Sequence, residues 1–307
     1  MTKVLVATEK PFAAEASEQI KAAFNDAGFE CSFFEKYENQ EELVKAVSDA
    51  EALIVRSDKV TEEVIKAAPN LKIVVRAGAG FDNVDLEAAT ANNVVVMNTP
   101  GQNSNAVAEL ALGMMVYQAR NHFNGSSGSE LLGKTLGIHA YGNVGKHVAR
   151  IAKGFGMEVI AFDPFIPKEA IEADGVIVCE SAEELYSSSD YLSLHIPANE
   201  KTKQSINYSL LSIMKEGATL INTARKEVIH EDDLLKVFEE RPGFKYLSDI
   251  APGNAELLTE RFSDRCFFTP KKMGAQTAEA NINAGVAAAK QIIAFTRDGD
   301  TTFQVNK

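Results

Sequence analysis

One segment constrains the fold more than any other: Thr135–Pro164, with the sequence TLGIHAYGNVGKHVARIAKGFGMEVIAFDP. Its apolar start is typical of a buried strand, and a glycine-containing turn follows. The next stretch carries apolar residues three and four positions apart, which indicates a helix with one buried face. A second apolar run then ends at an acidic residue. This order of strand, turn, helix and strand predicts one β-α-β unit of a parallel sheet.

The turn of this unit has the spacing of a dinucleotide site. Gly142 and Gly145 would let main-chain N–H groups approach a pyrophosphate at the start of the helix, where the helix dipole favours an anion. Asp163 follows Gly145 by 18 residues, where an acid accepts hydrogen bonds from ribose hydroxyls and repels a 2′-phosphate. The fingerprint has a glycine where Ala140 stands, so we expect a slightly wider turn. The pattern favours NAD over NADP, and the alternative is an ordinary strand-to-helix turn.

The composition is that of a globular chain with room for two domains. The 307 residues are 45% hydrophobic and 24% charged, and the net charge is −12. This acidity argues against nucleic acid or an anionic membrane as the main partner. We find no apolar run of membrane-spanning length and no signal-peptide pattern at the N-terminus. The three cysteines have no metal-ligand spacing, so we expect no metal site and reduced thiols in the cytoplasm.

Strand and helix patterns alternate along most of the chain. Strands are expected at residues 4–7, 31–34, 53–55, 73–75, 94–97, 191–194, 219–221, 246–247 and 267–268. Alternation of this kind predicts the α/β class, with two doubly wound parallel-sheet domains: a Rossmann-type cofactor domain inserted in a flavodoxin-like substrate domain. We place the substrate-binding domain at residues 1–101 and 285–307, and the NAD-binding domain at residues 102–284. An Ala-rich helix, expected over 281–295, would return to the first domain.

Four further segments place polar residues directly after predicted strands. They are Val55–Ser57, Val75–Asp85, Ile221–Arg225 and Thr269–Gln276. Because the carboxyl ends of parallel strands form the ligand-binding edge of an α/β sheet, we expect these segments at such edges. Together with the glycine turn, they resemble the D-isomer-specific 2-hydroxyacid dehydrogenases over essentially the whole chain.

The resemblance implies roles for several of these residues. Arg225 matches the family's catalytic arginine, whose guanidinium can hold a carboxylate bidentately and polarise the C2 oxygen. Arg56 and Ser57 match the position that meets a substrate phosphate in family members acting on phosphoglycerate. The loop whose amides would receive the substrate carboxylate comprises Arg76, Ala77, Gly78 and Ala79. The alternatives are a surface arginine after a strand, a solvated arginine before a helix, and glycines that merely allow a turn.

The expected catalytic base departs from the family pattern. The family has a histidine after Thr-Pro, in a pattern resembling TPHIGA, whereas this chain has TPKKMGA. Alignment backward from the glycine puts Lys272 in the place of the histidine and makes Lys271 an insertion. The family's partner glutamate is missing too, because Asn254 stands five residues after Asp249, and Glu256 is out of register.

We therefore hypothesise that Lys272 is the general acid/base. In the oxidative direction its neutral amine would take the hydroxyl proton as the C2 hydride passes to the cofactor. A lysine with an ordinary pKa of about 10.4 is a poor base at neutral pH. Arg225 and a dry site would both lower that pKa, and we expect an alkaline pH optimum for oxidation. The alternative is a pair of surface lysines that help to bind an anionic substrate.

The resemblance also implies which residues surround NAD. The main-chain amides of Asn143 and Val144 would bind the pyrophosphate, His195 would shape the pocket, and Asp249 would contact the nicotinamide amide. The predicted cofactor-binding residues are Gly142, Asn143, Val144, Gly145, Asp163, Pro164, His195, Ile196, Thr223, Ala224, Asp249, Gly274 and Ala275.

The activity that the resemblance implies is NAD-dependent oxidation of 3-phospho-D-glycerate to 3-phosphohydroxypyruvate, the first step of serine biosynthesis. The partner would be this small anionic substrate, the chain would form a homodimer, and its early end after the last helix resembles a short form without a regulatory domain. A glyoxylate or hydroxypyruvate reductase, or another D-2-hydroxyacid dehydrogenase, is the alternative enzyme. An NAD(H)-sensing protein similar to a co-repressor is the alternative of another class. The missing histidine and glutamate favour it, whereas the retained Arg56 and Arg225 oppose it.

Overall fold

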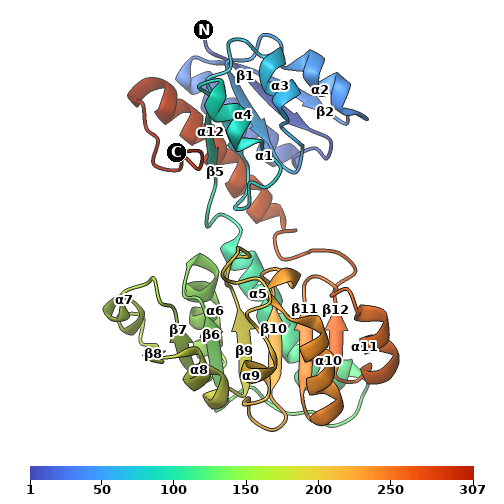
Figure 1. Ribbon diagram of the computed structural model, residues 1–307. Coiled ribbons are helices and arrows are strands. Elements are labelled where there is room, and N and C mark those ends of the chain that lie inside the picture. The colour runs from blue at the N-terminus through green and yellow to red at the C-terminus, as the bar shows by residue number, and fades with distance from the viewer. The chain divides into compact units, whose positions relative to one another are not determined.

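The computed structural model describes residues 1–307 and divides into two compact units. Unit 1 consists of residues 1–103 and 276–307, and unit 2 consists of residues 104–275 (Figure 1). The final helix, α12 (Ala278–Asp298), packs in unit 1 against α1 (Ala14–Ala27). The chain therefore returns to unit 1 at residue 276, rather than at residue 285 where the sequence placed the boundary.

Unit 1 is built on a five-stranded parallel sheet with the order β2-β1-β3-β4-β5. The strands are β1 (Lys3–Thr8), β2 (Glu30–Glu35), β3 (Ala52–Val55), β4 (Ile73–Arg76) and β5 (Val95–Asn98). This is the flavodoxin-like order, whose switch point lies between β1 and β3. The loops that follow these two strands are therefore the expected ligand-binding loops of unit 1.

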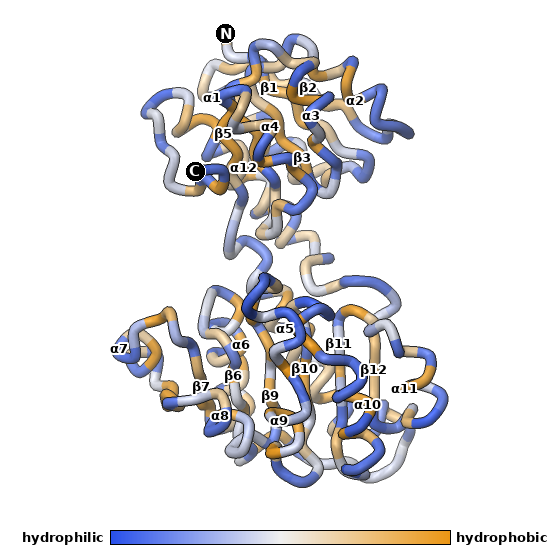
Figure 2. Tube along the Cα trace, in the orientation of Figure 1, coloured by the Kyte–Doolittle hydropathy of each residue, from blue (hydrophilic) through white to orange (hydrophobic).

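Helices cover both faces of the sheet of unit 1. One face packs on α1 and α12, through residues such as Ile20 and Ala288. The other face packs on α2 (Gln40–Ala46), α3 (Glu62–Ala67) and α4 (Leu86–Ala91). The strands between these layers are largely hydrophobic (Figure 2). Burial on both faces explains why the strand sequences are continuous apolar runs rather than alternating patterns.

Unit 2 is built on a seven-stranded parallel sheet with the order β12-β11-β10-β9-β6-β7-β8. The strands are β6 (Thr135–His139), β7 (Glu158–Phe162), β8 (Ile177–Val178), β9 (Tyr191–Leu194), β10 (Thr219–Asn222), β11 (Lys245–Ser248) and β12 (Cys266–Phe268). The strand order reverses between β6 and β9, which makes the carboxyl ends of these two strands the ligand-binding crevice of a doubly wound sheet. The two parallel sheets confirm the predicted α/β class.

The sheet of unit 2 also lies between two helical layers. Helices α5 (Ser104–Ala119), α6 (Asn143–Gly154) and α7 (Lys168–Glu172) pack on one face. Helices α8 (Ala182–Ser188), α9 (Tyr208–Leu211), α10 (Glu231–Glu240) and α11 (Ala255–Phe262) pack on the other. None of the helices in either unit combines the length and the apolar character that crossing a bilayer would require.

Candidate active site

In the turn between β6 and α6, the three positions of the dinucleotide-binding fingerprint have different structural roles. Ala140 has a φ of +78°, so it adopts the left-handed conformation that a glycine takes without strain. A Cβ added to Gly145 would lie 2.6 Å from the carbonyl oxygen of Ala140, so this glycine allows close packing of helix on strand. A Cβ added to Gly142 would meet nothing within 4 Å, and its φ of −78° is ordinary. The surrounding protein does not require that glycine, and a ligand that approaches the main chain would.

The start of α6 is a suitable anion site. Gly142 is its N-cap, and no side chain accepts a hydrogen bond from the first turn. The first N–H groups of a helix have no partner within the helix, so those of Asn143 and Val144 can bind a pyrophosphate, as the sequence predicts. The residues at this turn therefore fit the dinucleotide.

The strained alanine in this turn gives a test of stability. Replacing Ala140 by glycine is expected to raise the free energy of unfolding by about 0.5–1 kcal/mol, because about 1–2 kcal/mol of left-handed strain is relieved and the entropy cost of a glycine opposes part of the gain. The measurement is thermal unfolding. Ala170→Gly, at an exposed helical site in α7, is the control and should lose stability. A loss of stability in both variants would contradict the strain at Ala140.

Asp163 lies at the carboxyl end of β7 and is hydrogen-bonded to the glycine turn. Its Oδ2 accepts from the main-chain N–H of Tyr141 at 2.8 Å, and its Oδ1 accepts from those of Phe165 and Ile166 at 2.8 and 3.3 Å. These bonds use three of the roughly four lone-pair sites of a carboxylate. Asp163 therefore shapes the turn and keeps capacity for a ribose hydroxyl, while Pro164 begins the bend that follows.

Two histidines lie side by side at the crevice. The main-chain N–H of His195 donates to the carbonyl of His139 at 2.9 Å. The ring of His195 contacts the hydroxyl of Ser193 at 3.0 Å and that of Thr223 at 3.5 Å, and His139 contacts Tyr186 at 3.1 Å. Burial lowers the pKa of His139 to about 4 and that of His195 to about 3. Both rings are therefore neutral at neutral pH, and Ile196 is buried directly after them.

The structure brings the two predicted catalytic cations together. Nη1 of Arg225 donates to the carbonyl oxygen of Ala224 at 3.0 Å, and Nζ of Lys272 donates to the same oxygen at 2.9 Å. The two residues come from different loops, after β10 and after β12. A guanidinium and an ammonium that meet at one carbonyl can together attract a carboxylate and an oxygen that develops negative charge.

Asn222 holds the loop that carries Arg225, and the sequence did not single it out. It is the last residue of β10 and is fully buried. Its Oδ1 accepts from the N–H of Ala224 at 2.9 Å, and its Nδ2 donates to the carbonyl of Arg225 at 2.9 Å. The side chain thus fixes the turn that includes Thr223 and Ala224. Asn222 could have been identified from the sequence as an amide side chain at the end of a predicted buried strand, directly before the predicted site.

The predicted carboxylate loop of unit 1 is folded tightly on itself. The N–H of Ala77 donates to Val55 at 2.8 Å, and that of Gly78 donates to the carbonyl of Arg76 at 2.8 Å. Gly78 has a φ of +152°, and a Cβ there would overlap the guanidinium of Arg76. Two of the predicted amide donors are therefore used within the protein. Ala79, whose carbonyl accepts from Asn98, is the predicted loop residue with an N–H left for a substrate carboxylate.

Arg56 lies after β3, at the switch point of unit 1. Its Nη1 donates to the carbonyls of Lys10 and Pro11 at 3.0 and 3.1 Å, and its Nη2 donates to Asn281. The guanidinium lies 5.2 Å from the ring centre of Phe12. These partners hold the guanidinium in place but leave its charge without a paired carboxylate, which suits a phosphate. The neighbouring Ser57 is exposed.

Asp58 organises the loops around Arg56 and was not predicted either. Its Oδ1 accepts from the N–H of Glu9 at 2.6 Å and from the hydroxyl of Tyr37 at 2.8 Å, and its Oδ2 accepts from the N–H of Arg56 at 3.0 Å. It is 6% exposed. One carboxylate thus joins the loops after β1, β2 and β3. The only signal was an acidic residue directly after the strand-end Arg56-Ser57 pair, which also fits a solvated turn.

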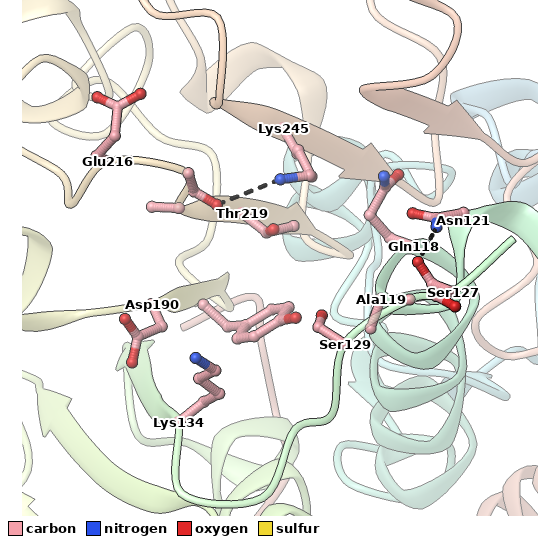
Figure 3. A pocket seen from close by; sticks show the side chains of 14 residues that line it. Gln118, Ala119, Asn121, Ser127, Ser129, Lys134, Asp190, Glu216, Thr219 and Lys245 are labelled. Atoms are coloured by element: carbon pink, nitrogen blue, oxygen red, sulfur yellow. Dashed lines mark hydrogen bonds between the residues drawn. The ribbon is translucent and has the colours of Figure 1, made fainter.

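A separate hollow lies at the opposite edge of the sheet of unit 2 (Figure 3). Its lining includes Lys134, Asp190, Thr219 and Lys245, at the starts of β6, β9, β10 and β11. Nζ of Lys245 donates to the main-chain carbonyls of Gly217 and Gly243. None of the predicted site residues lines this hollow, so the candidate active site is at the carboxyl edge.

Comparisons with known proteins identify the family. Residues 113–270 match the family described as D-isomer specific 2-hydroxyacid dehydrogenase, NAD binding domain. D-3-phosphoglycerate dehydrogenase of Methanocaldococcus jannaschii is 39% identical over 82% of this chain and 51% of the relative, and hydroxypyruvate reductase of Thermotoga maritima is 37% identical over 82% and 87%. The chain belongs to the D-isomer-specific 2-hydroxyacid dehydrogenase family, as the sequence predicted, and it spans about half the length of the first of these relatives.

A solved structure extends the similarity to the whole fold. The crystal structure of NAD+-bound 3-phosphoglycerate dehydrogenase from Entamoeba histolytica is 46% identical, covers 100% of this chain and 99% of its own, and has a TM-score of 0.88. The family match also covers most of unit 2. Unit 2 is thus an NAD-binding domain, which confirms the predicted cofactor.

Proposed function

We propose that this protein oxidises 3-phospho-D-glycerate to 3-phosphohydroxypyruvate with NAD, a reaction that supplies serine synthesis. The observation that carries the proposal is the pair of cations, Arg225 and Lys272, that meet at the carbonyl of Ala224. The relatives named as phosphoglycerate dehydrogenases support the choice of substrate. Reduction of hydroxypyruvate is the second candidate, because the relative with that name is similar over most of its own length.

The proposed chemistry assigns each cation one task. Arg225 holds the substrate carboxylate and polarises the C2 oxygen. Lys272, as the neutral amine, takes the proton from the C2 hydroxyl while the C2–H bond breaks, and in reduction its ammonium returns that proton. NAD supplies the acceptor for the hydride when it is bound. The alcohol thereby loses one proton and one hydride and becomes the ketone.

Three of the five histidines of the chain support Lys272 as the base by being unsuitable themselves. Burial lowers the pKa of His139 to about 4 and that of His195 to about 3, so they are weak proton acceptors at neutral pH. His230 is the N-cap of α10, where its Nδ1 accepts from the N–H of Asp233. Lys272 therefore has no competing base among these three residues.

Unit 1 supplies the proposed contacts to the anionic groups of the substrate. Arg56, with Ser57, would bind the phosphate, and the N–H of Ala79 would bind the carboxylate. The fixed guanidinium of Arg56, which three partners hold in place, supports this assignment because less side-chain entropy is lost on binding.

The test of the substrate compares phosphorylated and unphosphorylated acids. Initial rates of NADH formation should be highest with 3-phospho-D-glycerate, followed by D-glycerate and D-lactate. Arg56→Gln should raise KM for the phosphorylated acid by roughly 10–100-fold, the value of a charged hydrogen bond, and leave KM for D-glycerate nearly unchanged. Arg297→Gln, at an exposed site of α12, controls for loss of charge. An equal rise in KM for both acids would contradict the phosphate contact, and faster turnover of hydroxypyruvate would favour the reductase.

We also propose a homodimer that forms through unit 2, and the cytoplasm as the compartment. Phe123, Leu132 and Phe155 are 64%, 66% and 42% exposed, and Leu132 lies against Gly156, beside Phe155. Exposed large apolar side chains of this kind favour a protein interface. The free cysteines Cys31, Cys179 and Cys266 fit a reducing compartment.

A further inference from the structure

Asp249 is buried directly after β11 and faces the loop that carries Lys272. Its Oδ1 accepts from the main-chain N–H of Met273 at 2.7 Å and from the hydroxyl of Thr269 at 3.1 Å, and its Oδ2 accepts from the N–H of Gly274 at 2.7 Å. The residue is 1% exposed. These bonds occupy most of the acceptor capacity of a carboxylate, so the side chain is committed to the loop rather than turned to solvent.

The loop that carries Lys272 lies very close to the Asp249 carboxylate at Gly274. A Cβ added to Gly274 would lie 2.8 Å from Oδ2 of Asp249, so the glycine allows the loop to approach the carboxylate closely. On the other side of the loop, the hydroxyl of Thr269 also lies 2.8 Å from the carbonyl of Lys271. The main chain is therefore fixed on both sides of Lys272, which is itself exposed.

Lys272 extends from this anchored loop toward the loop that follows β10. Its Nζ reaches the carbonyl of Ala224 at 2.9 Å, where Nη1 of Arg225 lies at 3.0 Å from the same oxygen. Asn222 fixes that second loop through the N–H of Ala224. Asn222 and Asp249, at the ends of the neighbouring strands β10 and β11, thus hold the loops that carry Arg225 and Lys272.

We propose that Asp249 is the positioning residue for Lys272, acting through the main chain of residues 269–274. This inference rests on the proposed function, in which Lys272 transfers the proton. In the family pattern a glutamate orients a histidine through its side chain. Here the carboxylate of Asp249 binds the main-chain N–H groups of the loop that carries the lysine.

The test is a double-mutant cycle of Asp249→Asn and Lys272→Ala, with kcat for oxidation and the Kd for NADH as the measured quantities. Asparagine presents an N–H₂ group toward one of the two N–H donors, which displaces the loop. A displacement of about 1 Å can lower a rate by roughly 10²-fold. We expect Asp249→Asn to lower kcat by about 10–100-fold, with a nearly unchanged Kd for NADH. In the Lys272→Ala background the same change should have little further effect, because the two residues act as one unit.

Two further variants keep the test decisive. Thr269→Val removes one of the three bonds and should lower kcat in the same direction by less, and Asp232→Asn, at an exposed site of α10, should have no effect. If the two substitutions lowered kcat independently, the double variant would lose the product of the two factors, and the positioning role would be wrong. A large rise in the Kd for NADH in Asp249→Asn would also contradict it and would favour a direct contact of Asp249 with the cofactor. An unaffected Lys272→Ala enzyme would overturn the proposed base itself, and the two failures are thereby distinguished.

Discussion

Lys272→Ala is expected to lower kcat for oxidation by about 10²–10⁴-fold, the usual contribution of a positioned general base. The Kd for NADH should stay nearly unchanged, because Lys272 donates to the carbonyl of Ala224 and belongs to a loop rather than to the glycine turn. The measurements are steady-state rates over a range of pH and a fluorescence titration with NADH. Retained turnover would show that Lys272 serves only to attract the anionic substrate.

The adjacent lysine is the natural control for that experiment. Lys271 is exposed like Lys272, so Lys271→Ala removes the same charge one residue away. It should change KM by a small factor and leave kcat nearly intact. If both variants lost kcat equally, the loop as a whole would matter and no single amine could be named as the base.

The pH dependence of kcat shows which protonation state of Lys272 is active in each direction of the reaction. Oxidation needs the neutral amine, so its kcat should rise with pH, and reduction needs the ammonium, so its kcat should fall over the same range. Lys272→His would move both profiles to lower pH, because the ordinary pKa of histidine is about 6.5. Profiles that did not move with the identity of residue 272 would assign the titration to another group.

Local sequence patterns were sufficient for the elements of the fold. The β-α-β unit from Thr135 to Pro164 could be predicted because its strands are apolar runs and its helix has a regular apolar face. The parallel order followed from the alternation of strands and helices. The two-residue β8 was not predicted, because Ile177 and Val178 are too short a run to stand out.

The hydrogen-bond partners of Asp58 and Asn222 could not be predicted from the sequence. Asp58 binds main-chain groups of two loops whose proximity depends on the strand order, and Asn222 binds those of the turn that follows its own strand. The amides of Ala77 and Gly78 were expected to face a substrate, but they bond within the protein. A motif gives the type of residue at a position, whereas the hydrogen-bond partners depend on which strands become neighbours.

Gly142→Ala separates ligand binding from folding at the glycine turn. The alanine Cβ would enter open space at an ordinary φ of −78°, so the free energy of unfolding should stay nearly the same without cofactor. The Kd for NADH should rise by roughly 10–100-fold, because the methyl group displaces the pyrophosphate from main-chain N–H groups, and each hydrogen bond to a charged group contributes about 1.5–3 kcal/mol.

Gly145→Ala, three residues further on, should lower the free energy of unfolding and leave the Kd for NADH nearly unchanged. Its Cβ would lie 2.6 Å from the carbonyl oxygen of Ala140 and 3.1 Å from the side chain of Ile138, and overpacking of this kind costs about 1–3 kcal/mol of stability. The two variants differ by one methyl group each, so unfolding curves measured with and without NADH compare them directly. The opposite result would be a Gly142→Ala variant that unfolds more easily without cofactor and binds NADH normally. Gly142 would then be needed for the conformation of the turn, and the pyrophosphate would not bind in the open space beside it.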